Sequence, residues 1–161
     1  MFEVFLGLGT NLGIKTSNLL DARKHIQSEI GTITAISSLY ETEPWGDKNQ
    51  DNFYNQVIRL KTDIYPLALI KKCLEIEIKM GRVRTQKWAA RLIDIDILAI
   101  SGVQIHTENL VVPHPYIDKR KFVLLPWVEI ATEYYLPSYK ATLSEILKKV
   151  MDESWIKKVN S

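Results

Sequence analysis

Alternating hydrophobic and polar positions predict four strands in this chain. In the first of them, Phe2, Val4, Leu6 and Leu8 share one face, which is the period-two pattern of a strand. β-Branched residues or a similar alternation mark the other three. The strands are expected over residues 2–8, 32–40, 53–60 and 92–100.

Hydrophobic residues three to four positions apart predict four helices. The first starts at Ser17 and is followed by Gly31, where a helix C-terminus favours glycine. The second, over residues 66–80, opens with a proline, which suits the first helical position. Two more, over residues 122–131 and 142–150, follow the last strand.

The order of the core elements, β-α-β-β-α-β, is that of a ferredoxin-like α+β fold. Such a fold has an antiparallel sheet with both core helices on one face. We expect the two later helices to cover the other face, so that helices lie on both faces in a three-layer α/β/α arrangement. Neither a repeat nor a linker interrupts the pattern, so residues 1–161 are expected to form a single domain.

Composition narrows the class of protein further. Hydrophobic residues make up 46% of the chain, which excludes disordered and collagen-like proteins, and a net charge of +2 is too small for a protein that coats nucleic acid. The single cysteine, Cys73, lies in a helical pattern and predicts a small core residue in a reducing compartment. Without a basic leader or an apolar run of roughly 18 residues, we expect a cytoplasmic protein that does not enter membranes.

Two aspartates interrupt the fourth predicted strand. Asp is depleted in strands, yet Asp94 and Asp96 share one face, with Cα atoms roughly 6.6 Å apart at about 3.3 Å rise per residue. Their charges repel, so a divalent cation is a natural partner, and two carboxylates without His or Cys nearby favour Mg²⁺ or Mn²⁺. Such a site usually also uses phosphate oxygens, which points to a nucleotide. The alternative is a solvent-exposed face that the aspartates keep soluble.

Other polar residues surround this strand in the sequence. Glu77 lies in the middle of the apolar face of the second helix, where it could accept hydrogen bonds from a nearby Arg or from backbone amides, or anchor the loop that begins at Gly81. Arg82, Arg84 and Arg91 form a cationic segment able to reach phosphates, although a solvated basic loop has the same composition. Together with the aspartates they would form an electrostatic clamp for phosphoryl transfer.

The chain resembles the 6-hydroxymethyl-7,8-dihydropterin pyrophosphokinase family of folate synthesis at three motifs: Gly81-Arg-Val-Arg, Lys87-Trp-Ala-Ala-Arg-Leu-Ile-Asp-Ile-Asp-Ile-Leu and Val112-Pro-His. The resemblance extends from the first strand to about Glu129. It implies an ATP- and Mg²⁺-dependent diphosphotransferase that transfers the β,γ-diphosphate of ATP to the pterin hydroxymethyl group and releases AMP. ATP and 6-hydroxymethyl-7,8-dihydropterin would be its substrates, and a monomer that binds no nucleic acid is expected.

The same resemblance implies roles for individual residues. It implies two Mg²⁺ ions on Asp94 and Asp96, which with Arg82 and Arg91 would be the catalytic residues. The ATP-binding residues would be Arg82, Arg84, Arg91, Ile97, His114 and Arg120. The pterin-binding residues would be Thr42, Glu43, Trp45, Phe53, Asn55, Trp88, Asp94 and Phe122. The chain departs from the commoner family pattern at Glu43, Trp45, Phe53, Leu74, Ala89, Ala90 and Pro115.

Two other functions are compatible with a ferredoxin-like fold. A metal-dependent nucleotidyl transferase also holds magnesium on two carboxylates, but it needs a basic groove for a nucleic-acid backbone, which the net charge disfavours. A regulatory domain that binds a small ligand has no need for converging aspartates and arginines. Titration of Mg²⁺ with and without ATP separates this second alternative from both enzymes.

Overall fold

The computed structural model describes residues 1–44, 46–81 and 90–160. Its main sheet is made of β1 (Phe2–Thr10), β2 (Thr32–Ile36), β3 (Tyr40–Thr42), β4 (Phe53–Thr62), β5 (Asp94–Ile100) and β10 (Ile156–Lys158). The four α-helices are α1 (Lys15–Glu29), α2 (Pro66–Lys79), α3 (Lys121–Ala131) and α4 (Leu143–Lys149). The predicted helices and most of the predicted strands are therefore present, with ends shifted by a few residues.

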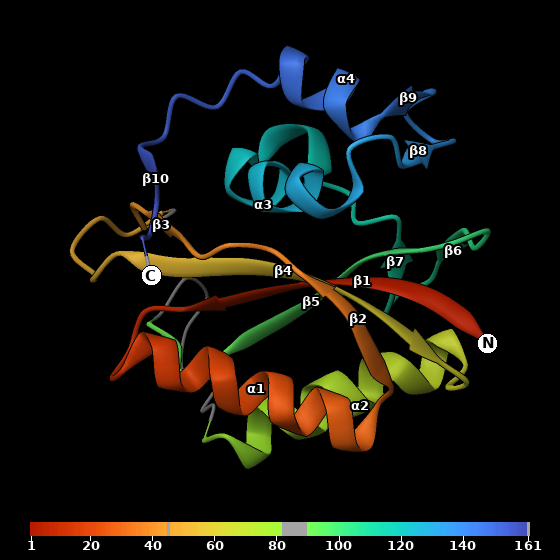
Figure 1. Cartoon of the computed structure of the whole chain (residues 1–161), viewed down its shortest axis with the longest axis horizontal. Helices are drawn as coiled ribbons and strands as arrows, with labels where there is room; N and C mark the ends of the chain where they lie inside the picture. Colours follow the sequence, from red (N-terminus) through yellow and green to blue (C-terminus); the bar gives the residue numbers. More distant parts are fainter. Residues whose placement is uncertain (45, 82–89, 161) are drawn as a thin grey trace.

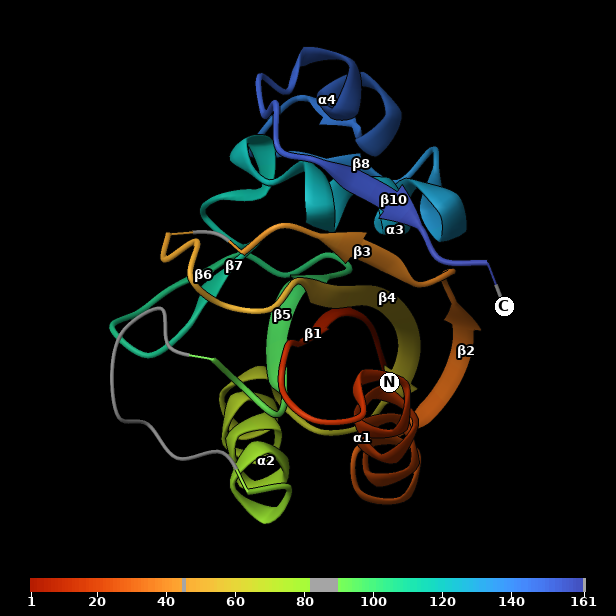
Figure 2. The ribbon, with the colours of Figure 1, turned by 90° about the vertical axis from the view of Figure 1, so that its left-hand side faces the viewer.

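The sheet is antiparallel, with the order β10-β3-β4-β1-β5, and β2 also pairs with β4. This is the strand order of a ferredoxin-like fold extended by one edge strand. Helices α1 and α2 lie on one face of the sheet, and α3 and α4 lie on the other (Figure 1). The predicted three-layer α+β arrangement is thus confirmed, and the view turned by 90° shows the same three layers (Figure 2).

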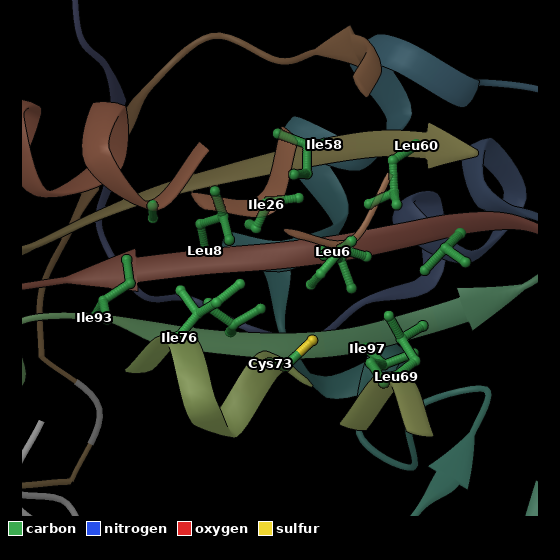
Figure 3. Packing of buried hydrophobic residues seen from close by; sticks show 14 of the residues in the cluster. Leu6, Leu8, Ile26, Ile58, Leu60, Leu69, Cys73, Ile76, Ile93 and Ile97 are labelled. Atoms are coloured by element: carbon green, nitrogen blue, oxygen red, sulfur yellow. The ribbon is translucent and has the colours of Figure 1, made fainter. Parts of the chain in front are cut away.

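The sheet has a hydrophobic core on each face. On the α1 and α2 side, Val4, Leu6 and Leu8 pack against buried residues of both helices, as the sequence pattern predicts (Figure 3). Cys73 is completely buried there, which confirms its predicted place in the core. On the other side, Phe5 packs against Trp127 of α3, with ring centroids 5.4 Å apart.

The predicted second strand, residues 32–40, was wrong as a single element. It is divided into β2 and β3 by a break at Ser37. The hydroxyl of Ser37 accepts a hydrogen bond from Val57 N (3.0 Å) and donates one to Ser38 O (2.8 Å), so a side chain replaces part of the backbone pairing. A serine can satisfy backbone groups locally in this way, and this ends the regular ladder.

The sequence patterns missed several short elements. These are the hairpin pairs β6 (Ile105–His106) with β7 (Val111–Val112) and β8 (Tyr135–Leu136) with β9 (Ala141–Thr142), the 3₁₀ turn η1 (Ile117–Lys119), and the C-terminal strand β10. Elements of two or three residues are too short to produce a periodic pattern.

In the described part of the chain, no helix has both the length and the apolar character that crossing a bilayer requires.

Gly31 is required by a close approach between backbones. A Cβ atom added at Gly31 would lie 2.2 Å from the carbonyl oxygen of Lys61, and Thr62 Oγ1 donates a hydrogen bond of 2.6 Å to Ile30 O beside it. The glycine therefore follows α1 as predicted, but what it provides is contact between the end of this helix and β4.

We expect Gly31→Ala to lower the free energy of unfolding by more than about 3 kcal/mol, because backbone atoms must move to admit the methyl group. Gly102→Ala is a suitable control, since its φ of 72° is strained for alanine but open space surrounds it. The control should lose only about 1 kcal/mol. Urea unfolding measures both values, and equal losses would contradict this account of Gly31.

Candidate active site

The floor of the candidate site is formed by two rows of residues, each of which runs across β4, β1 and β5. In the first row, Asn55 of β4 lies opposite Gly9 of β1, which lies opposite Asp94 of β5. In the second row, Val57, Gly7 and Asp96 are aligned in the same manner. Because alternate residues of a strand share a face, both aspartates lie on one face of β5, as predicted, and this face is on the α3 side of the sheet.

A cavity of about 100 Å³ lies above these two rows. Gly7 and Gly9 carry no side chain into it, so space remains between the aspartates and Asn55. The walls above the floor come from the end of β3, the residues just before β5, and the beginning of α3. The lining residues include Thr42, Glu43, Phe53, Asn55, Arg91, Asp94, Asp96, Arg120 and Phe122.

The Asp96 carboxyl is in an environment that disfavours negative charge. Removal from bulk water raises its pKa to about 7, and the neighbouring charges of Asp94 and Glu77 act in the same direction. The guanidinium of Arg120, whose Nη1 lies 3.9 Å from Asp96 Oδ2, and that of Arg91 oppose this shift. The negative charge here is thus only partly compensated by the described residues.

Arg91 is fixed by contacts with the floor. Its Nη1 donates a hydrogen bond of 2.6 Å to Asp94 Oδ2. Its backbone N–H donates to Asn11 Oδ1 (2.7 Å), and its carbonyl accepts from Asn11 N (3.0 Å). The Asn11 amide group also donates to Gln50 Oε1 (2.9 Å) and to Asp51 O (3.2 Å). Asn11 therefore joins the end of β1, the segment before β5 and the loop before β4.

Glu77 supports the aspartates from the opposite face of the sheet. Its side chain is 2% exposed, and Oε1 accepts a hydrogen bond of 2.7 Å from the backbone N–H of Ile95, the residue between Asp94 and Asp96. This confirms the interpretation of Glu77 as a buried acceptor for a backbone amide close to the site.

The β3 wall of the cavity presents hydrogen-bonding groups. Asn55 Nδ2 donates to Thr42 Oγ1 at 2.8 Å, and both side chains are buried. Phe53 lies opposite Thr42 in the β3–β4 pairing, and Glu43 follows Thr42 directly. These four of the eight residues predicted for the pterin site are therefore close to one another.

The α3 wall contributes the guanidinium group of Arg120 and a second aromatic ring, that of Phe122. Arg120 stands immediately before α3 and its guanidinium lies over the rings of Tyr116 (5.4 Å) and Phe122 (5.8 Å). His114 is not among the described residues that line this cavity and instead lines a second hollow with Ile105 and Tyr139. Its Nδ1 accepts a hydrogen bond from Tyr116 N (3.2 Å), so its ring proton resides on Nε2. Burial and the charge of Arg120 lower the pKa of His114 to about 4, and its ring is neutral at pH 7.

The other predicted site residues lie elsewhere or outside the described residues. Ile97, predicted to contact the adenine of ATP, is buried with Leu69 and Cys73 in the core on the α1 and α2 side (Figure 3), and it is not among the described residues that line the cavity. Four predicted residues fall outside the described ranges: Trp45, Arg82, Arg84 and Trp88.

Sequence reasoning missed Gly7, Gly9 and Asn11 as components of this site. Both glycines belong to β1, which extends to Thr10 and therefore past the predicted end of the strand at Leu8. A signal was available, because glycine inside a strand often marks a place where a ligand approaches the backbone. Asn11 gave no such signal, since its partners are about 40 and 80 positions away in the chain.

The chemistry of the donor set fits a hard divalent cation. Among the described residues, no cluster of three or more His, Cys, Asp or Glu side chains is placed to hold a metal ion. Asp94 and Asp96 offer neighbouring carboxylate oxygens on the floor of the cavity, and Mg²⁺ commonly completes such a partial shell with water and phosphate oxygens.

The raised pKa of Asp96 predicts how stability depends on pH without metal. A carboxyl whose folded-state pKa lies above its ordinary value of 3.8 destabilises the folded protein progressively as pH rises from about 4 to about 7. The substitution Asp96→Asn removes the titrating carboxyl and with it this pH-dependent destabilisation. The melting temperature of the variant should therefore exceed that of the original chain by a margin that grows up to about pH 7 and is constant above it.

Thermal melts in EDTA between pH 4 and pH 8 measure this margin. Glu108→Gln, which removes an exposed carboxylate remote from the cavity lining, should give a curve parallel to that of the original chain. A margin for Asp96→Asn that is the same at every pH would contradict the assigned environment.

Comparison with known proteins agrees with this geometry. Residues 5–132 match the model of the family described as 7,8-dihydro-6-hydroxymethylpterin-pyrophosphokinase (HPPK). The chain is 41% identical over 160 residues to a 2-amino-4-hydroxy-6-hydroxymethyldihydropteridine pyrophosphokinase of Methylorubrum extorquens, covering 99% of both chains. It is also 41% identical over 145 residues to the enzyme of the same name from Aquifex aeolicus, covering 90% of both.

Solved structures agree on the fold. The wild-type HPPK-DHPS of Plasmodium falciparum superposes with a TM-score of 0.74 at 19% identity, over 92% of this chain. This chain spans only 44% of that longer protein, so the likeness concerns one part of it. From the family model and the two bacterial relatives we conclude that the chain belongs to the 7,8-dihydro-6-hydroxymethylpterin-pyrophosphokinase family.

Proposed function

We propose that this chain is an ATP-dependent pyrophosphokinase of folate biosynthesis. The pterin hydroxymethyl oxygen attacks the β-phosphorus of ATP and releases its proton to water, while the bond between the α,β-bridging oxygen and the β-phosphorus breaks. The products are the pterin diphosphate and AMP. The observation that carries the proposal is the position of Asp94 and Asp96 at a cavity whose other side presents Thr42 and Asn55. The cavity thus has one end suited to phosphates and cations and another suited to a flat polar heterocycle.

The pterin is proposed to bind between the β3 and α3 walls. Phe53 and Phe122 line opposite walls of the cavity, and their rings suit offset stacking on the two faces of a pterin. The hydrogen-bonded pair of Thr42 and Asn55 would recognise its amide edge. In this position the hydroxymethyl group points along the Gly9 and Gly7 side of the floor toward Asp94.

The phosphates are proposed to lie over the aspartates, near Arg91 and Arg120. Asp94 and Asp96 would hold two Mg²⁺ ions, which when bound neutralise charge on the transferring phosphates. Arg91 is held by Asp94 and by the backbone contacts with Asn11, so its guanidinium is already oriented. The neutral His114 would offer its Nε2 proton to a phosphate or ribose oxygen.

No nucleophilic side chain is needed for this reaction. Direct in-line attack by the substrate hydroxyl requires positioning and charge stabilisation, which the walls and the cations supply. Arg82, Arg84, Trp45 and Trp88 retain the roles in ATP and pterin binding that the resemblance implies.

The product nucleotide tests the proposed reaction. The chain should convert ATP and 6-hydroxymethyl-7,8-dihydropterin to AMP and the pterin diphosphate in the presence of Mg²⁺. Chromatographic separation of the nucleotides distinguishes AMP from ADP, with a reaction lacking pterin as the control. Formation of ADP with a monophosphorylated pterin would overturn the proposal.

The aspartates should be essential for turnover. Asp94→Asn and Asp96→Asn should each lower kcat by at least about a hundredfold, because removal of one metal ligand removes several kcal/mol of charge stabilisation. The fold should persist, since each change also removes repulsion within the pair. Steady-state kinetics and thermal melts test this prediction, with Glu108→Gln as the charge-matched control. Turnover near the original value in saturating Mg²⁺ would refute the assigned role of either residue.

A further inference from the structure

Residues 152–159, near the C-terminus, have no assigned role in the reaction, yet they make contacts with both walls of the cavity. We propose that residues 152–159, here called the C-terminal strap, position these two walls and so determine how tightly the pterin binds. The proposal rests on the proposed function of the cavity. The strap runs from the end of α4 over to the edge of the sheet, where β10 lies beside β3 (Figure 1).

The strap holds the β3 wall by backbone pairing. Ile156 pairs with Thr42, whose side chain lines the cavity. Trp155 N donates a hydrogen bond of 2.9 Å to Glu43 Oε1, while Glu43 N donates to Trp155 O at 3.4 Å. Val159 N donates a further hydrogen bond of 2.8 Å to the carbonyl oxygen of Leu39, the residue directly before β3. A three-residue strand such as β3 depends on pairing along both edges, and the strap supplies its outer edge.

The strap holds the α3 wall through one carboxylate. Asp152 Oδ2 accepts a hydrogen bond of 3.1 Å from the backbone N–H of Lys121, the first residue of α3. Asp152 Oδ1 accepts from Ser154 N at 2.9 Å and also from the Ser154 hydroxyl, which fixes the orientation of the carboxylate. A carboxylate at this position satisfies one of the amides that a helix start leaves without an intrahelical partner.

The position of this contact links it to substrate binding. Lys121 stands between Arg120 and Phe122, and both of these residues line the cavity. No residue of the strap is among the described lining residues, so the strap acts through other side chains and its members are positioning residues. One segment thus fixes the distance between Thr42 and Glu43 on one side and Phe122 on the other. This distance must match the thickness of a flat heterocycle.

The first test compares two acidic neighbours. Asp152→Ala should raise the KM for the pterin about tenfold, while the KM for ATP and the kcat change by less than threefold. Asp152→Asn keeps an oxygen that can accept from Lys121 N and should restore the pterin KM to within threefold of the original. Glu153→Ala removes the same charge from the exposed neighbouring residue and should leave all three constants unchanged.

The second test removes the hydrogen bond between the strap and Glu43. Trp155→Pro lacks the donor N–H and should raise the pterin KM, whereas Trp155→Ala keeps the N–H and should stay within threefold of the original. A uniform loss of kcat with an unchanged pterin KM in Asp152→Ala and Trp155→Pro would mean that the strap only supports folding, and it would overturn the proposal.

Hydrogen exchange separates the proposal from the proposed function. The amides of Thr42, Glu43 and Phe122 should exchange at least tenfold faster in Asp152→Ala or Trp155→Pro than in Glu153→Ala. Unchanged exchange in both variants overturns the strap as a positioning element, whatever the enzyme does. If the original chain forms no AMP, the proposed function fails, and this exchange comparison still decides the role of the strap.

Discussion

The structure depends above all on holding two negative charges side by side on one strand. Asp94 and Asp96 share a face of β5, and their cross-strand neighbours in β1 are the glycines Gly9 and Gly7. Glu77 fixes the strand between them by accepting the N–H of Ile95 from the opposite face. Backbone geometry thus holds the two carboxylates together in spite of their electrostatic repulsion, and the guanidinium groups of Arg91 and Arg120 lie beside them.

The remaining parts of the site are arranged around this charged floor. The β3 wall and the α3 wall belong to different layers of the molecule, and the lining residues of each come from short segments at the ends of elements. Such segments have few core contacts of their own, so their positions depend on hydrogen bonds from distant parts of the chain. Asn11 provides these bonds near Arg91, and residues of the strap provide them near Glu43 and Lys121.

Local patterns in the sequence predicted the layers and the charged floor but not the links between segments. In residues 2–8 and 92–100, the alternation of hydrophobic and polar positions shows which residues share a face of the strand. The position of Leu6 in the core and the shared face of Asp94 and Asp96 could therefore be predicted. The break at Ser37 and the strand β10 depend on pairing partners far away in the chain, which periodicity does not reveal. Family resemblance named Thr42, Asn55 and Phe122, whereas the strap lies beyond the residues 5–132 that the family model matches.

The claim that Asp94 and Asp96 form a divalent-cation site is tested most directly by counting bound metal ions. Electron paramagnetic resonance can measure Mn²⁺ bound to the protein in complex with a non-hydrolysable ATP analogue, corrected for Mn²⁺ bound to the nucleotide alone. We expect two Mn²⁺ ions per complex for the original chain and fewer for a chain in which both aspartates are replaced by asparagine. The same number of ions bound with the same affinity in both proteins would contradict it.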